Sequence, residues 1–522
     1  MRLSALTAAL AVGIIAPLAP QTAFAAQAAP DSGSATTWYE SQKPQWKQCG
    51  GTAPARFQCA TIQVPLDYQR PEGPKTGVEI SRLRTSVPGK RHGVLLFNPG
   101  GPGAEGLSVP LDMAAKLPAS VLDKYDLIGF DPRGLGRSSP LNCGFTQEED
   151  QFFDSPYKPE TAQRDIATAR SMAQKCEAKE GDRIPHITTR NTVRDMDVIR
   201  AVLGEKKISY LGISYGTYLG AVYTQMFPHR ADRFVLDSAV DPKRVWRGMI
   251  QVRAEEAGSA FARWSKWTAT RDARYDLGAT PAEVRDTFWK LVRKADRAPI
   301  TLRGESWDGD RIRGDLAFGF YYVKTGAEKV EDLRRASLGL PVGPPPAPAP
   351  YTPPPGGTET TWSVICGDDE TAWPRNPAQY RKDSIRDKAR YPIYGDFTSN
   401  IKPCAFWGKS AEPVTVVDNT VPALILQNEW DAQTPQITGI GMHKALKGSR
   451  LVSVKGGEGH GIYHGAPGQC AVKAGNDYLA TGALPRRNVT CAATDDQNSL
   501  AEENTGSRTR AGLPTWSTGQ PG

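Results

Sequence analysis

The chain has 522 residues, of which 39% are hydrophobic and 23% charged, and it carries a formal net charge of +8. This length exceeds one simple core and predicts either one large domain with insertions or two domains. The composition is typical of a soluble globular protein, and the basic residues form no dense Lys/Arg run. We therefore expect no nucleic-acid binding.

The first residues have the pattern of a secretory signal peptide. Met1-Arg2 is positive, Leu3 to Leu18 is almost wholly apolar, and Ala23-Phe24-Ala25 offers a small-x-small cleavage site. The apolar run is too short to span a membrane, and no other stretch approaches that length. We expect a signal peptide at 1–25, a leader or pro-segment at 26–40, and an exported, soluble protein without a membrane partner.

The eight cysteines predict disulfides, because their number is even and the chain is expected to be exported. None has the C-x-x-C spacing of a zinc or thioredoxin-like site. Counting cannot settle the connectivity, and sequential pairing is the simplest hypothesis. It gives Cys49–Cys59, Cys143–Cys176, Cys366–Cys404 and Cys470–Cys491.

Apolar strands and amphipathic helices alternate along the chain, as in a mostly parallel α/β sheet. Two strands alternate with period two, and later ones are continuous apolar runs that end in turn signals. Between them, Thr192 to Leu203 has helical periodicity. The expected strands are Cys59–Val64, Val78–Leu83, Gly93–Phe97, Tyr125–Phe130, Ile208–Leu211, Arg233–Asp237, Val421–Gln427 and Arg450–Val454.

The sequence pattern changes after Pro242, where apolar residues with helical spacing replace the strand patterns. We expect a core at 41–241, an inserted helical cap at 242–365 and the second part of the core at 366–493. Within the cap, the Pro-rich run 341–357 predicts an extended surface loop. The tail at 494–522 is polar and predicts disorder.

Gly212-Ile213-Ser214-Tyr215-Gly216 stands between a predicted strand and a predicted helix. In this context a G-x-S-x-G sequence predicts a nucleophile elbow, because glycines allow the sharp turn that projects the serine hydroxyl. Ser214 is therefore the candidate nucleophile.

A serine nucleophile needs a base and an acid that orients the base. In enzymes whose serine stands on a nucleophile elbow of this kind, the three follow in the chain order Ser, Asp/Glu, His. Asp431 follows the strand at Val421–Gln427, and His460 lies between glycines just after the last strand. The open alternatives are Glu429, Asp237 and Asp241 for the acid, and His464 for the base.

The loop Asn98-Pro99-Gly100-Gly101-Pro102-Gly103 follows an early strand, where such enzymes place an oxyanion donor. Pro102 has no N–H, so Gly101 is the candidate, paired with the N–H of Tyr215. A plain glycine turn is the alternative. We expect Asp131 to Ser138 to be structural, pinning loops through a carboxylate–guanidinium pair.

Five motifs together resemble the secreted tripeptidyl aminopeptidases of the Streptomyces type, which are proline-iminopeptidase-like serine peptidases with the α/β-hydrolase fold. Pro99 stands where proline iminopeptidases usually have histidine, which favours the tripeptidyl branch. The Pro-rich run has no counterpart. The motifs are N-P-G-G-P-G at 98–103, G-F-D-P-R-G-L-G at 129–136, the elbow segment 204–223, W-D-A-Q-T-P at 430–435 and G-H-G at 459–461.

The resemblance implies an α/β-hydrolase fold with an inserted cap and a monomer that cuts tripeptides from peptide or protein N-termini. It implies neither a metal nor an organic cofactor. A carboxylate should bind the substrate ammonium, and the candidates are Asp368 first, then Asp369 and Glu370, unless this loop is merely solvated. A secreted carboxylesterase or lipase with the same triad is the alternative function. An inactive binding protein is disfavoured by the intact Ser, Asp and His.

Overall fold

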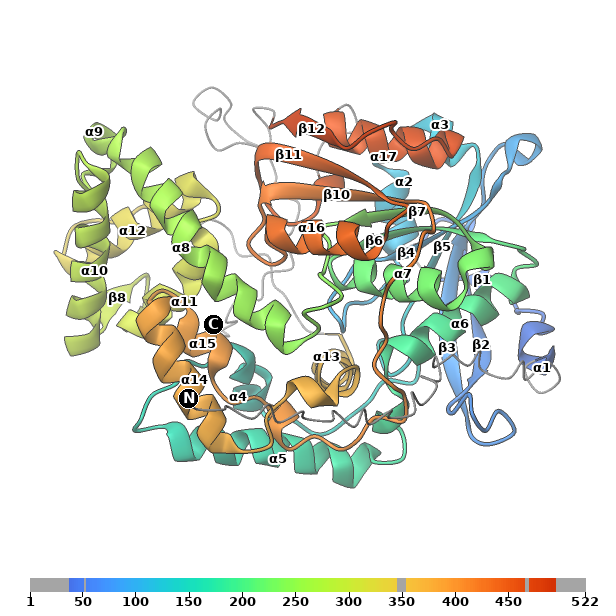
Figure 1. Ribbon diagram of the computed structural model, residues 1–522, viewed down its shortest axis with the longest axis horizontal. Helices are drawn as coiled ribbons and strands as arrows, with labels where there is room; N and C mark the ends of the chain where they lie inside the picture. Colours follow the sequence, from blue (N-terminus) through green and yellow to red (C-terminus); the bar gives the residue numbers. More distant parts are fainter. Residues whose placement is uncertain (1–36, 51–52, 345–353, 465–468, 494–522) are drawn as a thin grey trace, which may run out of the picture.

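The computed structural model describes residues 37–50, 53–344, 354–464 and 469–493 (Figure 1). The predicted signal peptide, the leader up to residue 36 and the tail from residue 494 lie outside the described residues. Most of the Pro-rich run, at 345–353, also lies outside them. The last leader residues form α1 (Thr37–Glu40), whose Tyr39 is buried against the core.

A ten-stranded sheet forms the core, in the order β1-β2-β3-β5-β4-β6-β7-β10-β11-β12. From β5 to β12 in this order, each strand runs parallel to its neighbours. The pairs β1–β2, β2–β3 and β3–β5 are antiparallel. The strands are β1 (Lys47–Gln48), β2 (Phe57–Pro65), β3 (Lys75–Leu83), β4 (Gly93–Asn98), β5 (Tyr125–Phe130), β6 (Ile208–Ile213), β7 (Ala231–Asp237), β10 (Ala423–Trp430), β11 (Arg450–Glu458) and β12 (Val489–Ala492).

Both faces of the sheet are covered because successive side chains of a strand point to opposite faces. In β4, Leu96 packs in one apolar cluster, and Leu95 and Phe97 pack in another. The helices on the first face are α6 (Thr189–Val202), α7 (Tyr215–Met226) and α16 (Gln436–Ala445). Those on the second are α2 (Val109–Ala114), α3 (Ala119–Leu122) and α17 (Cys470–Thr481).

A second, mainly helical body lies to one side of the sheet in Figure 1, and we call it the cap. It comprises α8 (Arg247–Ala269), α9 (Asp272–Tyr275), α10 (Pro281–Arg297), α11 (Gly309–Gly319), α12 (Val323–Ser337), α14 (Pro377–Arg390), α15 (Gly395–Ser399) and a hairpin of β8 (Ile300–Leu302) and β9 (Glu305–Trp307). The hairpin was not expected, since three-residue strands carry too short a pattern to read.

The cap has its own apolar cluster, with Trp264 and Phe320 at its centre. The start of α10 has a clear sequence signal, because Thr280 and Glu283 form a capping box there. The cluster also contains Tyr394 and Phe397, so the helical packing continues past the expected boundary at residue 365.

The segment between α12 and α14 holds α13 (Gly357–Gly367), and the segment between β5 and α6 holds α4 (Gln147–Asp150) and α5 (Ala162–Glu180). All eight cysteines are paired, and the sequential hypothesis is confirmed at each of the four bonds. The bond between Cys366 and Cys404 ties α13 to the chain that leaves the cap.

The Asp131 loop contains a buried carboxylate–guanidinium pair. Arg133 is 1% exposed and pairs with Asp195 of α6, with an N–O distance of 2.5 Å. Asp131 instead accepts hydrogen bonds from the backbone amides of Gly106, Leu107 and Arg137. The Arg133 guanidinium thus ties this loop to α6.

Candidate active site

Three of the predicted site residues follow neighbouring strands of the sheet. Ser214 follows β6, Asp431 follows β10 and His460 follows β11, and β7 lies between β6 and β10. These strands are parallel, so their carboxyl ends meet at one edge. The topology therefore brings together residues that lie more than two hundred positions apart in sequence.

Ser214 has the strained backbone that a nucleophile elbow requires, with φ 57° and ψ −123°. It immediately precedes α7, so its hydroxyl stands where the helix begins. A Cβ on Gly216 would lie 2.6 Å from the carbonyl oxygen of Asn98, which explains glycine at that position. The sharp turn is thus fixed by close backbone contact with the end of β4.

Asp431 and His460 form a buried pair, at 0% and 4% exposure. His460 Nδ1 lies 2.9 Å from both carboxylate oxygens. Thr434 Oγ1 donates to Asp431 Oδ2 at 2.9 Å, and the amides of Gln433 and Thr434 both donate to Oδ1 at 2.9 Å. Asp431 is therefore a carboxylate that accepts hydrogen bonds on both oxygens.

Electrostatics keep this carboxylate ionised. Burial acts to raise the pKa of Asp431, but the charge and hydrogen bond of His460 and the two backbone amides bring the pKa below its usual range. An ionised Asp431 accepts the Nδ1 proton of His460, which leaves Nε2 as the unprotonated nitrogen. Among the described residues no hydrogen bond joins Ser214 Oγ to His460, as is common for an active site without substrate.

Within the described part of the chain, no hydrogen bond joins a rival acid to His460. Glu429 accepts the amide of Gly456, Asp241 accepts that of Lys243, and Asp237 accepts those of Ile462 and Tyr463. The side chain of His464, the rival base, lies outside the described part of the chain.

The loop at 98–103 passes directly beside the serine. Gly100 has φ 115°, and a Cβ there would lie 2.9 Å from Ser214 Cβ, so only glycine permits this approach. Gly101 and Tyr215 both line the pocket at Ser214. In the described ranges neither of their amides has a hydrogen-bond acceptor, so two backbone N–H groups are available beside the serine.

The pocket at Ser214 is mainly apolar, and Arg253 is its one charged residue among those described. Cap, core and α13 all contribute to its walls. The lining residues are Gly101, Pro102, Phe153, Ser214, Tyr215, Val240, Trp246, Met249, Ile250, Arg253, Thr361, Ile365, Gln433 and Thr434.

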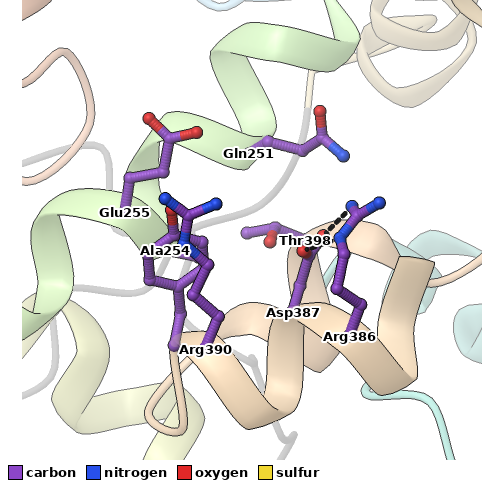
Figure 2. Close-up of a pocket in the computed structure, with 8 residues that line it drawn as sticks. Gln251, Ala254, Glu255, Arg386, Asp387, Arg390 and Thr398 are labelled. Carbon is purple, nitrogen blue, oxygen red and sulfur yellow. Dashed lines mark hydrogen bonds and ion pairs between the residues drawn. The ribbon is translucent and has the colours of Figure 1, made fainter.

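A larger cavity, of about 290 Å³, lies between α8 and α14 rather than at Ser214. Figure 2 shows Arg386 and Arg390 on one wall and Gln251 and Glu255 on the other. Its residues come from a different face of α8 than those at Ser214, and it contains no nucleophile beside a base. We therefore place the chemistry at the smaller pocket.

The structure does not bring Asp368 to the serine pocket. The residue is buried behind the pocket wall, where it accepts the Thr189 amide at 2.8 Å, the Thr189 hydroxyl at 2.6 Å and Trp246 Nε1 at 3.0 Å. Burial raises its pKa to about 6, against these hydrogen bonds. Asp369 bonds to Thr371 in its own turn, and Glu370 lies 3.8 Å from Arg375.

Glu256 is a carboxylate near the pocket that the sequence motifs did not indicate. One face of the segment that begins α8 lines the pocket with Trp246, Ile250 and Arg253. Glu256 lies one helical turn beyond Arg253 on the same face. Burial raises its pKa. Burial raises the pKa of the Tyr321 hydroxyl, and the negative charges of Glu256 and Asp431 raise it further. The helical spacing of these residues was the signal that could have revealed it.

The described residues contain no group of three or more His, Cys, Asp or Glu side chains placed to hold a metal ion. Within the same ranges, every helix is too short or too polar to cross a bilayer.

Two sequence families match the chain, one described as alpha/beta hydrolase fold over residues 93–278 and one described as TAP-like protein over residues 391–491. A tripeptidyl aminopeptidase of Streptomyces coelicolor is 34% identical over 480 residues, covering 86% of this chain and 85% of that protein. Serine protease Hip1 of Mycobacterium tuberculosis is 27% identical, covering 90% and 93%. Carboxylesterase B of the same organism is 29% identical, covering 83% and 86%. The chain belongs to the tripeptidyl aminopeptidase family of serine peptidases with the α/β-hydrolase fold.

Proposed function

We propose that this chain is a secreted exopeptidase that releases tripeptides from free N-termini through an acyl-enzyme on Ser214. The observation that carries the proposal is the buried Asp431–His460 pair at the same sheet edge as Ser214. Serine, base and acid occur in the order that this fold requires.

In the proposed reaction the Ser214 hydroxyl attacks the scissile carbonyl while His460 Nε2 takes its proton. The resulting oxyanion accepts hydrogen bonds from the amides of Gly101 and Tyr215. His460 then gives the proton to the leaving amine as the C–N bond breaks. Water hydrolyses the acyl ester by the same route, and Asp431 stabilises the imidazolium in both halves.

The charge in the serine pocket bears on how many residues are released. An enzyme that removes one residue pairs the substrate ammonium with a carboxylate close to the cleaved bond. The described lining at Ser214 has no carboxylate, and its one charged residue is Arg253. An ammonium would be repelled there, so this arrangement supports an anchor farther away and a longer released peptide.

Glu256 is the anchor that we propose in place of Asp368. It lies one turn of α8 beyond the pocket lining and is partly desolvated, so a substrate ammonium would form a charge-assisted hydrogen bond with it. Asp368 cannot serve without giving up its bonds to Thr189 and Trp246.

Glu256→Gln should weaken cleavage of unblocked tripeptidyl amides and spare short acyl esters, which do not reach the anchor. Loss of one such contact costs about 1.5–3 kcal/mol, roughly tenfold or more in kcat/KM. Glu255→Gln is the matched control, because the neighbouring carboxylate is 3.5 Å from Arg244 and faces the other cavity. Equal losses in both variants, or efficient cleavage of N-acetylated tripeptides, would contradict the anchor.

An esterase is the second candidate, favoured by the apolar pocket walls and by the relative named Carboxylesterase B. A substrate panel separates the two. The peptidase proposal predicts that kcat/KM for tripeptidyl amides exceeds that for aminoacyl amides and follows Glu256, whereas an esterase would hydrolyse short acyl esters and leave every amide intact.

Secretion is supported by the four disulfides, which form in oxidising compartments. Sequencing the N-terminus of protein collected from the culture medium should place cleavage after residue 25. Protein found only inside cells with its first residues intact would contradict export. Light scattering of the same sample should give the mass of a monomer.

A further inference from the structure

Three consecutive amides after His460 donate to residues at the carboxyl end of β7, two strands away from β11 in the sheet. Gly461 N–H donates to Ser238 Oγ at 2.8 Å. Ile462 N–H and Tyr463 N–H donate to the two carboxylate oxygens of Asp237, each at 2.9 Å. Both acceptor residues are fully buried. Buried carboxylates that collect successive amides hold a loop in one conformation.

The same aspartate also holds the nucleophile elbow. Its backbone carbonyl accepts the amide of Ser214 at 3.0 Å. One residue at the end of β7 therefore contacts the segment that carries the candidate nucleophile and the segment that carries the candidate base. In the sheet order, β7 lies between the strand that leads to Ser214 and the two that lead to Asp431 and His460.

The other side of the base loop is held differently. Asn428 Nδ2 donates to the carbonyl of Gly459 at 2.9 Å, and the Gly459 amide donates to Trp430 at 3.0 Å. These bonds fix the entry to His460 from β10. On the exit side of His460, Asp237 and Ser238 are the only side chains of the described chain that accept hydrogen bonds from the backbone amides of residues 461–463.

We propose that Asp237, assisted by Ser238, is a positioning residue that sets the separation between Ser214 and His460. This inference rests on the proposed roles of those two residues. Asp237 touches neither substrate nor the imidazole nitrogen that takes the proton. It acts through two backbone segments, so it should control the rate of the proton transfer without affecting substrate binding.

The environment of Asp237 adds a pH dependence. Burial raises the pKa of its carboxyl to about 6, the amides of Ile462 and Tyr463 and the charge of His460 oppose this, and the charge of Asp431 adds to it. The Tyr463 hydroxyl donates to Asn476 Oδ1 at 3.2 Å, and its pKa is raised by burial and by the charges of Asp237 and Asp477. A protonated carboxyl cannot accept both amides, because one oxygen then carries a hydrogen.

The test uses Asp237→Asn, which puts a donor opposite the Tyr463 amide, and Ser238→Ala, which removes one acceptor. Asp241→Asn is the matched control, because among the described residues the carboxylate of this neighbouring acid bonds only within its own loop, to Lys243 and Arg244. A fluorophosphonate titrates reactive Ser214 in each protein, so that kcat is expressed per functional site. The downfield proton resonance of His460 Nδ1–H reports the imidazole directly.

For Asp237→Asn we expect kcat per titrated site to fall at least about tenfold, while KM stays within about twofold of wild type. The Nδ1–H resonance of His460 should shift. In wild type the rate should decrease below about pH 6 as Asp237 is protonated, and this decrease should be absent from the variant. Ser238→Ala should show a smaller fall in kcat and decides the matter if Asp237→Asn does not fold. Unchanged kcat per site in the folded variants would overturn the inference. A wild-type protein that is not labelled at Ser214 would overturn the proposed function as well.

Discussion

At the scale of single residues, local sequence patterns located the candidate triad more clearly than the group that would bind the substrate ammonium. Ser214, Asp431 and His460 stand in turns whose glycines and prolines are visible in the sequence, and the structure gathers them at one edge. Asp368 has the same kind of local signal, yet its carboxylate points inward to Thr189 and Trp246. The direction of a side chain depends on tertiary neighbours that no local pattern contains.

Asp368→Ala should therefore destabilise the fold and leave substrate preference unchanged. It would leave the buried Thr189 and Trp246 N–H groups without an acceptor, at a cost of about 1–3 kcal/mol for each such group. Urea unfolding measures the loss, and the ratio of tripeptidyl amidase to esterase activity should stay within about twofold of wild type. A selective loss of tripeptidyl activity would restore Asp368 as the anchor.

The same variant tests the sign of a pH effect. Burial raises the folded-state pKa of Asp368 to about 6, above its unfolded value, so the folded state binds the extra proton. The stability that this group contributes is present below the unfolded pKa and declines as pH rises through about 6, by on the order of 3 kcal/mol. The stability gap between wild type and Asp368→Ala should be larger at pH 4.5 than at pH 8, and the opposite order would contradict the burial argument.

At the scale of elements, the long strands were predictable because each is a continuous apolar run closed by a turn signal. The hairpin of β8 and β9 was not, and neither was the packing of Tyr394 and Phe397 into the cap. Those residues lie beyond the Pro-rich run and inside the loop that the Cys366–Cys404 disulfide closes, and only tertiary contact assigns them to the cap. Whether a segment forms a helix or a strand depends on its local sequence, whereas whether it packs in the cap or in the core depends on tertiary contacts.

The disulfide between Cys366 and Cys404 should matter for the pocket as well as for stability. It holds the end of α13, whose Thr361 and Ile365 line the pocket. Replacing both cysteines with alanine should lower the unfolding free energy by about 2–4 kcal/mol and raise KM.

The control is the double alanine variant of Cys470 and Cys491, a pair joining α17 to β12 on the far side of the sheet. It should cost similar stability and leave KM unchanged. A KM increase of the same size in both variants would mean that the effect is general loosening of the fold.

At the scale of the whole molecule, the order of strands in the sheet brings the site together. Placing β6, β7, β10 and β11 side by side and parallel gathers their carboxyl ends, and the cap inserted between β7 and β10 supplies α8 as a wall. Sequence motifs predicted both halves of this arrangement, the sheet edge and the insertion above it. They could not predict which carboxylate of the cap faces the cleft, because that depends on how α8 is rotated.

The most direct test is to treat the purified protein with a fluorophosphonate and map the label by mass spectrometry, with tripeptidyl amide hydrolysis measured in parallel. The account predicts a single labelled residue, Ser214, loss of activity in proportion to labelling, and unchanged activity in EDTA. Ser214→Ala should fold normally, take no label and lose at least about a thousandfold in rate. A label on another serine, or a folded Ser214→Ala protein with wild-type activity, would contradict it.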